Sequence, residues 1–206
     1  MQERFQVRSP LAMVVLALLI EAPMHAYRMQ QLIKERAKDT VVNVAQRNSV
    51  YQAIAILLRK GLIRVDETSR EGGRPERTVY QVTEEGTATF YRWLRSMLST
   101  PGREFPIFPA ALAFLMMISP DDAVRQLSAR MATLKKQLAE SRTTFKAVRS
   151  SGLPRLFLLE DEYRQSMLRA EIDWLSKVIA DLRSKELSWS KEWIRKVAQK
   201  MEAQQE

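Results

Sequence analysis

The chain has 206 residues, of which 46% are apolar, and it contains no cysteine and a single histidine. This composition is typical of a packed globular protein, and it excludes disulfide bonds, thiolate metal sites, cysteine nucleophiles and clusters of histidine ligands. The formal net charge of +9 favours a polyanion or an acidic surface as the partner.

The apolar run at residues 11–20 is too short to cross a membrane, because a spanning helix needs about 20 apolar residues. We therefore predict a buried helix here, no membrane partner and a cytoplasmic location. A signal peptide is the alternative interpretation, but no small-residue cleavage pattern follows the run cleanly.

Three helices are predicted in the first part of the chain. Ser9 is a suitable N-cap for the first helix, and Pro10 fits its opening turn, where a missing N–H costs nothing. Helical spacing predicts a second helix in "HAYRMQQLIKERA", where His25 has a capping role at the start, and a third helix that Gly61 ends. The predicted inward residues are Tyr27, Met29 or Gln30, Leu32 and Ile33 in the second helix, and Val50, Tyr51, Ile54, Leu57 and Leu58 in the third.

Two strands are predicted next, because "LIRVDE" and "RTVYQV" alternate apolar with polar residues. The polar connection between them makes a hairpin whose tip carries Arg70, Arg74 and Arg77. Thr83 suits the N-cap of a fourth helix with an apolar face of Phe90, Trp93 or Leu94, and Met97. The order of helix, helix, helix, strand, strand and helix predicts a winged helix-turn-helix domain.

Polar side chains at the start of the third helix can reach phosphates or base edges, as recognition helices do. They are Arg47, Asn48, Ser49 and Gln52. Tyr51 has two open roles, since its spacing suits the core and its hydroxyl suits a phosphate contact. The hairpin arginines are interpreted as phosphate or minor-groove contacts, and ordinary solvated hairpin charges are the alternative.

The segment "STPGREFPIFP" breaks the helical periodicity and is the predicted domain boundary. We predict a DNA-binding domain at residues 1–98, a linker with a short helix at 99–119, and a helical dimerisation domain at 120–206. An apolar seam predicts one long helix, with residues Val124, Leu127, Met131, Leu134, Leu138, Ser141, Phe145 and Val148.

A second long helix is predicted over about residues 155–185, and it carries two apolar stripes. One stripe is Leu168, Ile172, Leu175, Ile179 and Leu182, and the other is Leu159, Tyr163, Met167, Trp174 and Val178. Two helices can cover too little of this surface, so we expect a second subunit to pair with it. A further amphipathic helix is predicted in the tail. The fold class is therefore mainly α with a small β-hairpin.

The aromatic and methionine-rich residues of the second half have two open uses. They are Phe105, Phe108, Phe114, Met116, Met117, Trp174, Trp189 and Trp193, and they suit either packing between domains and subunits or the lining of an effector pocket. The sequence has no glycine-rich phosphate loop, no nucleophile with a base and no metal-ligand spacing. We therefore predict a protein that is not an enzyme and that needs no cofactor or metal.

The chain resembles the PadR family of bacterial transcriptional regulators, in the longer form with a virulence-activator-like helical domain. The resemblance rests on "SPLAMVVLALL", "HAYRMQQLI", "NSVYQAIAILLRKGLI" and "GGRPERTVYQVTEEG". Two positions depart from the family pattern. His25 stands where a glycine is common, and "NSVYQAI" replaces the usual "G-T-L-Y" or "P-A-L".

The resemblance implies a homodimeric regulator of double-stranded DNA, commonly a repressor, which binds a pseudo-palindromic operator. By position, Ser49, Tyr51 and Gln52 match the family's recognition helix, and Arg74, Arg77 and Tyr80 match its wing. Some relatives release DNA when a small aromatic or hydrophobic compound binds, so an effector of this class is a candidate partner whose site residues are unknown. A protein-binding adaptor with a helical assembly scaffold is the alternative function.

Overall fold

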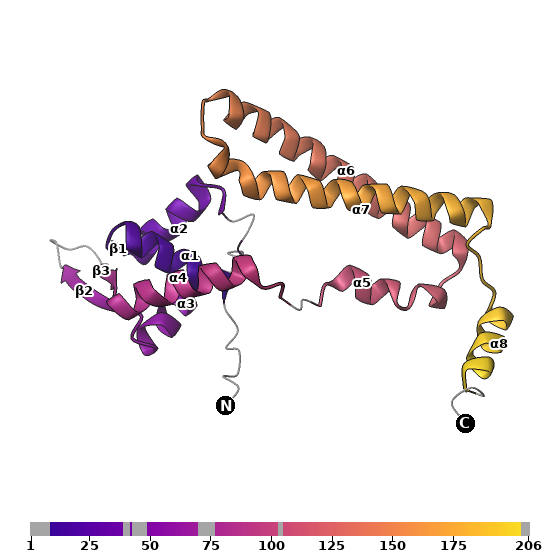
Figure 1. Ribbon diagram of the computed structural model, residues 1–206, viewed down its shortest axis with the longest axis horizontal. Helices are drawn as coiled ribbons and strands as arrows, with labels where there is room; N and C mark the ends of the chain where they lie inside the picture. The colour runs from indigo at the N-terminus through magenta and orange to yellow at the C-terminus, as the bar shows by residue number, and fades with distance from the viewer. Residues whose placement is uncertain (1–8, 39–41, 43–48, 70–76, 103–104, 203–206) are drawn as a thin grey trace. The chain divides into compact units, whose positions relative to one another are not determined.

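A computed structural model of the chain describes residues 9–38, 42, 49–69, 77–102 and 105–202. It has two compact units, Met1–Arg103 and Glu104–Glu206, which are coloured from indigo to magenta and from magenta to yellow in Figure 1. The N-terminal unit joins helices to a small antiparallel sheet, and the C-terminal unit is helical throughout its described residues. The predicted fold class is confirmed.

The central helix of the N-terminal unit is α1 (Pro10–Glu21). Its N-cap is Ser9, whose Oγ accepts a hydrogen bond from the Ala12 N–H at 3.3 Å. The helix is apolar on all sides, which suits a helix surrounded by others. Its buried residues are Ala12, Val15, Leu16, Leu18 and Leu19.

The next helix is α2 (Ala26–Glu35), and its cap confirms the role predicted for His25. The Nδ1 atom of His25 accepts a hydrogen bond from the Arg28 N–H at 3.2 Å. The prediction that Tyr27 points inward was wrong, because its side chain is 60% exposed. With the cap at residue 25, the inward stripe begins one residue earlier and runs through Ala26, Met29, Leu32 and Ile33.

The third helix, α3 (Ser49–Arg59), buries Val50, Ala53, Ile54 and Leu57. The prediction that Tyr51 is inward was also wrong, since it lies one position round the helix from this stripe and is 50% exposed. Gly61 follows the helix with φ +65°, a backbone conformation that glycine adopts without steric cost. The predicted end of α3 is therefore confirmed.

The sheet has three antiparallel strands in the order β1-β3-β2. The predicted hairpin is β2 (Ile63–Ser69) with β3 (Arg77–Val82), and Val65 lies opposite Tyr80. The sequence gives no periodic signal for β1 (Met24–His25), which has two residues and pairs with the other edge of β3. Helix α4 (Glu84–Ser99) follows, with its predicted cap Thr83 accepting from the Gly86 N–H at 3.0 Å.

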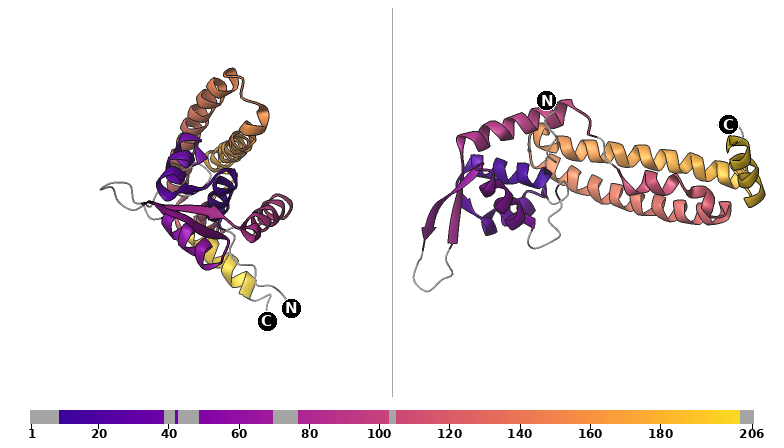
Figure 2. Two further views of the ribbon diagram at one scale, coloured as in Figure 1. Left: turned by 90° about the vertical axis from the view of Figure 1, so that its left-hand side faces the viewer. Right: turned by 90° about the horizontal axis from the view of Figure 1, so that it is seen from below.

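The C-terminal unit is built on an antiparallel pair of long helices, α6 (Pro120–Ser150) and α7 (Leu159–Ser184). Both figures show these helices side by side (Figures 1 and 2). The remaining elements are α5 (Ile107–Leu112), η2 (Leu115–Met117), η3 (Arg155–Leu158) and α8 (Lys191–Glu202). The second long helix was predicted to begin at about residue 155, but residues 155–158 form the turn η3 and α7 begins at Leu159.

The two stripes predicted on α7 have different surroundings. The first stripe is buried against α6, where Ile172, Leu175, Ile179 and Leu182 pack with Leu127, Leu134 and Leu138. The second stripe is open at its start, where Leu159, Tyr163 and Met167 are 46%, 68% and 49% exposed. Further along, Trp174 lies against Phe108 and Val178 packs on the α6–α7 core. Among the helices that the structure describes, none is long and apolar enough to span a membrane.

Candidate nucleic-acid interface

Helix α3 presents an outward face of mixed polarity. Tyr51, Gln52, Ala55 and Arg59 are all exposed on it, opposite the stripe that packs into the core. Ser49 is half-buried at the first position of the helix. The predicted contacts Arg47 and Asn48 lie outside the residues that the structure describes.

The wing is fixed to the start of α2 through the small strand β1. Met24 pairs with Tyr80 and His25 pairs with Val79 across the β1–β3 ladder, so the cap of α2 and the wing belong to one sheet. Tyr80 is half-buried and packs against the core of the unit. The backbone of Arg77 begins β3 opposite Ser69, whereas Arg70 and Arg74 lie outside the described residues.

Arg64 is a basic wing residue that the sequence analysis missed. It is exposed on β2, and its Nε and Nη2 donate to Oε1 of Gln81 on β3 at 3.1 and 2.7 Å. This partner is a neutral amide, so the hydrogen bonds hold the guanidinium in place without cancelling its charge. The alternating pattern of β2 could have identified it, because Arg64 occupies the polar face of that strand.

Several other arginines of the N-terminal unit are paired with carboxylates. Arg36 bonds Glu21 at 2.7 Å, and Arg28 bonds Glu35 at 3.1 Å. The hydrogen bond from Arg36 lowers the pKa of Glu21 below its ordinary value, against a smaller opposing effect of burial. These pairs reduce the positive charge around α2, so Arg59 and Arg64 stand out as basic side chains on α3 and the wing.

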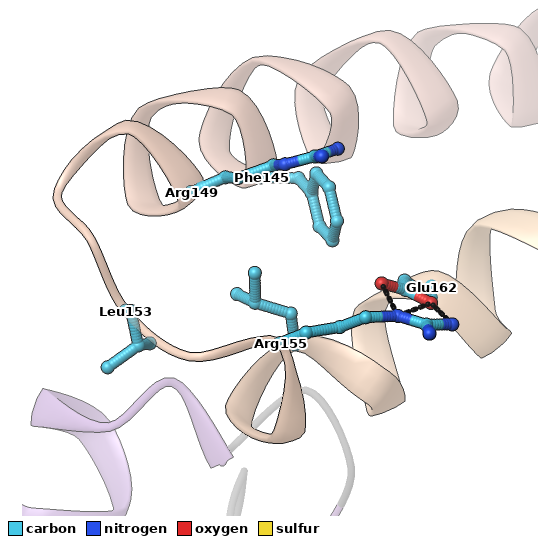
Figure 3. A pocket seen from close by; sticks show the side chains of 6 residues that line it. Phe145, Arg149, Leu153, Arg155 and Glu162 are labelled. Atoms are coloured by element: carbon cyan, nitrogen blue, oxygen red, sulfur yellow. Dashed lines mark hydrogen bonds and ion pairs between the residues drawn. The ribbon is translucent and has the colours of Figure 1, made fainter.

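A hollow of about 160 Å³ lies at the turn between α6 and α7 (Figure 3). Phe145, Leu153 and Leu158 contribute apolar walls, and Arg149, Arg155 and Glu162 contribute charge. Arg155 donates to both carboxylate oxygens of Glu162, with the shortest contact at 2.9 Å from Nη2 to Oε2. This bond is the main cause of the lowered pKa of Glu162, to which the charge of Arg149 adds. Two arginines and one glutamate leave the hollow with one excess positive charge.

The aromatic cluster predicted either to pack or to line a pocket includes packed residues. Phe108 lies edge-on to Trp174 with ring centroids 6.1 Å apart, and Arg130 lies 3.7 Å over the Phe108 ring. Trp189 packs on the same core and donates its Nε1–H to the Ile118 carbonyl at 2.8 Å. These three aromatic residues therefore pack within the C-terminal unit, and packing between domains or subunits stays a prediction. Among the described residues, no group of acidic and histidine side chains could hold a metal ion.

Comparison with solved structures shows the same fold in several regulators. Bacillus subtilis PadR in complex with operator DNA has a TM-score of 0.66 and 18% identity, covering 84% of this chain and 98% of that chain. The same protein in complex with p-coumaric acid has a TM-score of 0.66 and 16% identity, covering 84% and 98%. The Vibrio cholerae virulence activator AphA has a TM-score of 0.65 and 18% identity, covering 85% and 99%.

Comparison with curated proteins gives no significant match. Comparison with protein families gives a match of residues 15–92 to the transcriptional regulator PadR-like family. This match contains α2, α3 and both strands of the wing, which are the elements that form the outward face described above. Residues 15–92 of the chain are therefore similar to the PadR-like family of transcriptional regulators.

Proposed function

We propose that this chain, whose residues 15–92 match the transcriptional regulator PadR-like family, is a DNA-binding regulator of transcription that acts as a homodimeric repressor on a pseudo-palindromic operator. The match of residues 15–92 to this family supports a regulator of transcription over an enzyme. Residues 1–98 bind DNA, residues 120–206 form the dimer, and residues 99–119 connect them. The protein acts in the cytoplasm, where it meets its operator.

The observation that carries this proposal is the exposed face of α3 beside a basic wing. Tyr51, Gln52 and Arg59 are exposed on α3, and Arg64 is held on the wing by Gln81. A helix of this kind fits the major groove, where an amide can read adenine and a guanidinium can read guanine or bind phosphate. The wing arginines, including Arg74 and Arg77, then grip the flanking backbone.

The C-terminal unit supplies the argument for two copies. Leu159, Tyr163 and Met167 form an exposed apolar stripe on α7. Soluble monomers rarely expose large apolar patches of this kind, because apolar area is favourably removed from water. A two-fold dimer would cover the stripe and hold two α3 helices at a fixed separation.

Binding to the promoter upstream of the protein's own gene, measured across a salt series, tests this function. The expected result is tight binding to that duplex and weak binding to a scrambled duplex of equal length. The affinity for the promoter should fall steeply with salt, because phosphate contacts release counterions. Equal, weak binding to both duplexes would contradict an operator at that promoter, and transcription in vitro would show whether bound protein represses.

The adaptor function is separated from DNA binding by reversing two wing charges. Arg74→Glu with Arg77→Glu should abolish operator binding by placing negative charge beside phosphate, while the dimer remains intact. If the double variant binds DNA as tightly as the wild type, the wing does not contact the DNA. The adaptor function would be favoured by two results together. The wild type would not bind DNA, and the double variant would still bind a protein partner.

The hollow in Figure 3 is the effector site of this proposal. Its apolar walls and its excess positive charge fit a small aromatic or hydrophobic anion, and a structure of Bacillus subtilis PadR holds p-coumaric acid. Calorimetry with p-coumarate should show binding that Arg149→Ala weakens and that Arg142→Ala, one exposed position on the same helix, leaves unchanged. Equal binding by both variants would place the effector elsewhere, and operator release by p-coumarate would link the site to regulation.

A further inference from the structure

The outward face of α3 carries little charge. Its exposed residues are Tyr51, Gln52, Ala55, Ile56 and Arg59. Of these five, Arg59 alone is charged. Helix α4 of the same unit exposes four charged side chains, which are Glu84, Glu85, Arg92 and Arg95. A helix face that is turned to water usually carries several charges, so the composition of the α3 face indicates contact with a ligand.

The sequence around this face contains no carboxylate, since no aspartate or glutamate occurs between Asp39 and Asp66. In the major groove a carboxylate accepts from cytosine N4, an amide pairs with adenine, and an apolar side chain contacts the thymine 5-methyl group. The α3 face offers the amide of Gln52 and the apolar side chain of Ile56. Arg59 is the last residue of α3, whereas recognition helices contact bases through their N-terminal residues. The groups in reach of the bases therefore favour A·T pairs.

Gln52 and Ile56 are neighbours on the helix surface, because they lie four positions apart. Ile56 is 38% exposed, and exposed Ala55 beside it ends at its Cβ, which leaves room for the DNA to come close. Residues at this spacing have Cβ atoms about 5–6 Å apart, and successive base pairs are separated by about 3.4 Å. The two side chains thus match base pairs that are one or two steps apart.

Ile56 is held in a fixed position on α3. The Lys60 N–H donates to the Ile56 carbonyl at 3.1 Å, so Ile56 lies within regular helical backbone. Leu57, the next residue, is fully buried and anchors this turn in the core. A β-branched side chain in a helix has one strongly preferred χ1 rotamer. The exposed methyl groups of Ile56 are therefore ordered before any ligand binds, which lowers the entropy lost on binding.

We infer that Ile56 contacts the 5-methyl group of a thymine and that Gln52 bonds an adenine in a nearby pair, so each operator half-site contains A·T pairs opposite α3. The contact is favourable because it removes two apolar groups from water. Cytosine and uracil have hydrogen in place of this methyl group and lose the contact. The inference rests on the DNA-binding function proposed above and names the base pairs that this function selects.

Selection from a random duplex library by the full-length protein supplies the DNA for the test. The enriched half-sites should share an adenine and a thymine one or two pairs apart. Gln52→Ala should lose the preference for the adenine, and Ile56→Ala should lose the preference for the thymine. Enriched half-sites made of G·C pairs alone would overturn the inference, and a library without any enriched duplex would contradict the DNA-binding function and the inference together.

Replacing thymine by uracil in the enriched duplex removes the methyl group and keeps the base pairing. At one thymine of a half-site this change should weaken binding by the wild type about fourfold, the effect expected for one buried methylene-sized group. The measurement needs no substitution in the protein, so it does not depend on the folding of a variant. Tight, salt-dependent binding that uracil changes at no position would refute the inference and leave the regulator function standing.

Ile56→Ala assigns the methyl contact to this residue. In the variant the ratio of the affinities for the thymine and uracil duplexes should fall from about four to about one, because the two changes remove the same contact. Leu98→Ala is the matched control, since it removes the same number of carbon atoms from a side chain of α4 that is 79% exposed. The control should keep the ratio of about four. A ratio that stays at about four in Ile56→Ala would show that another residue contacts the methyl group.

Discussion

Gly86 is the residue where the packing of the N-terminal unit leaves least room. A Cβ at this position would overlap the Leu62 carbonyl oxygen and would lie 2.9 Å from the Val82 Cγ2. The obstacle includes backbone, so α4 has to move to accept a side chain. We expect Gly86→Ala to destabilise the unit by about 2 kcal/mol despite the better helix propensity of alanine. Urea unfolding measures this, and Gly102→Ala, with open space around it, is the control that should show no loss.

Ser141 and Gln165 form a polar pair within the otherwise apolar contact of α6 and α7. Gln165 is 4% exposed, and its Nε2 donates to the Ser141 Oγ at 3.1 Å. Arg169 donates to Gln165 Oε1 at 3.1 Å, which satisfies the other end of the amide. Such a pair costs little while complete, and it fixes the register of two helices.

Replacing one residue of this pair should lower the free energy of unfolding more than replacing both residues. Ser141→Ala leaves the buried Gln165 N–H₂ without its acceptor, so we expect a loss of about 1–2 kcal/mol. Adding Gln165→Leu should recover most of the loss, because the polar group then leaves the core as well. Thermal unfolding of the two single variants and the double variant tests this, and strictly additive effects would contradict it.

Local signals in the sequence predicted the caps, whereas helical phase was harder to predict. Ser9, His25 and Thr83 cap their helices as expected, since a cap depends on a few neighbouring residues. Tyr27 was assigned to the wrong face, and Tyr51, whose role was left open, is exposed where its spacing also suited the core. A tyrosine at the edge of an apolar stripe is amphipathic, so helical spacing alone allows it to be buried or exposed. The residues that pack around it determine which of the two occurs.

At the scale of elements, period and length were predictable and pairing was not. Strand β3 and the ends of α3 and α6 follow from alternation, glycine and proline. Strand β1 has two residues and forms only because β3 offers it a free edge. A contact that depends on a partner more than fifty residues away leaves no local pattern, so the link between α2 and the wing was missed.

The exposed tyrosine of α3 gives a prediction for the recognition helix. Tyr51→Ala should weaken operator binding by at least tenfold, or about 1.4 kcal/mol, with little change in stability because half of the side chain is already exposed. Tyr91→Ala on α4 is the control, since Tyr91 is 44% exposed and lies outside α3 and the wing. Fluorescence anisotropy measures the affinity and circular dichroism the stability. Equal affinity losses would show that Tyr51 has no particular role at the DNA.

At the scale of the whole molecule, the sequence gives a predicted role for each half more directly than a prediction of how the halves act together. Charge, strand alternation and the order of elements indicated a DNA-binding unit, and the two stripes of α7 indicated a covered surface. The wing residue Arg64 was missed because its significance depends on Gln81 across the ladder.

The number of chains on the operator can be read from the salt dependence of binding. Each phosphate contact adds about 0.9 to the slope of log affinity against log salt concentration. In a dimer every wing arginine occurs twice, so Arg77→Gln should reduce the slope by about 1.8, whereas a bound monomer would lose about 0.9. Arg92→Gln removes the same charge from α4, where Arg92 bonds Glu85 at 3.0 Å, and it should leave the slope unchanged. A reduction of about 0.9 for Arg77→Gln would mean that one wing alone grips the DNA, and equal reductions in both variants would mean that net charge, not the wing, sets the affinity.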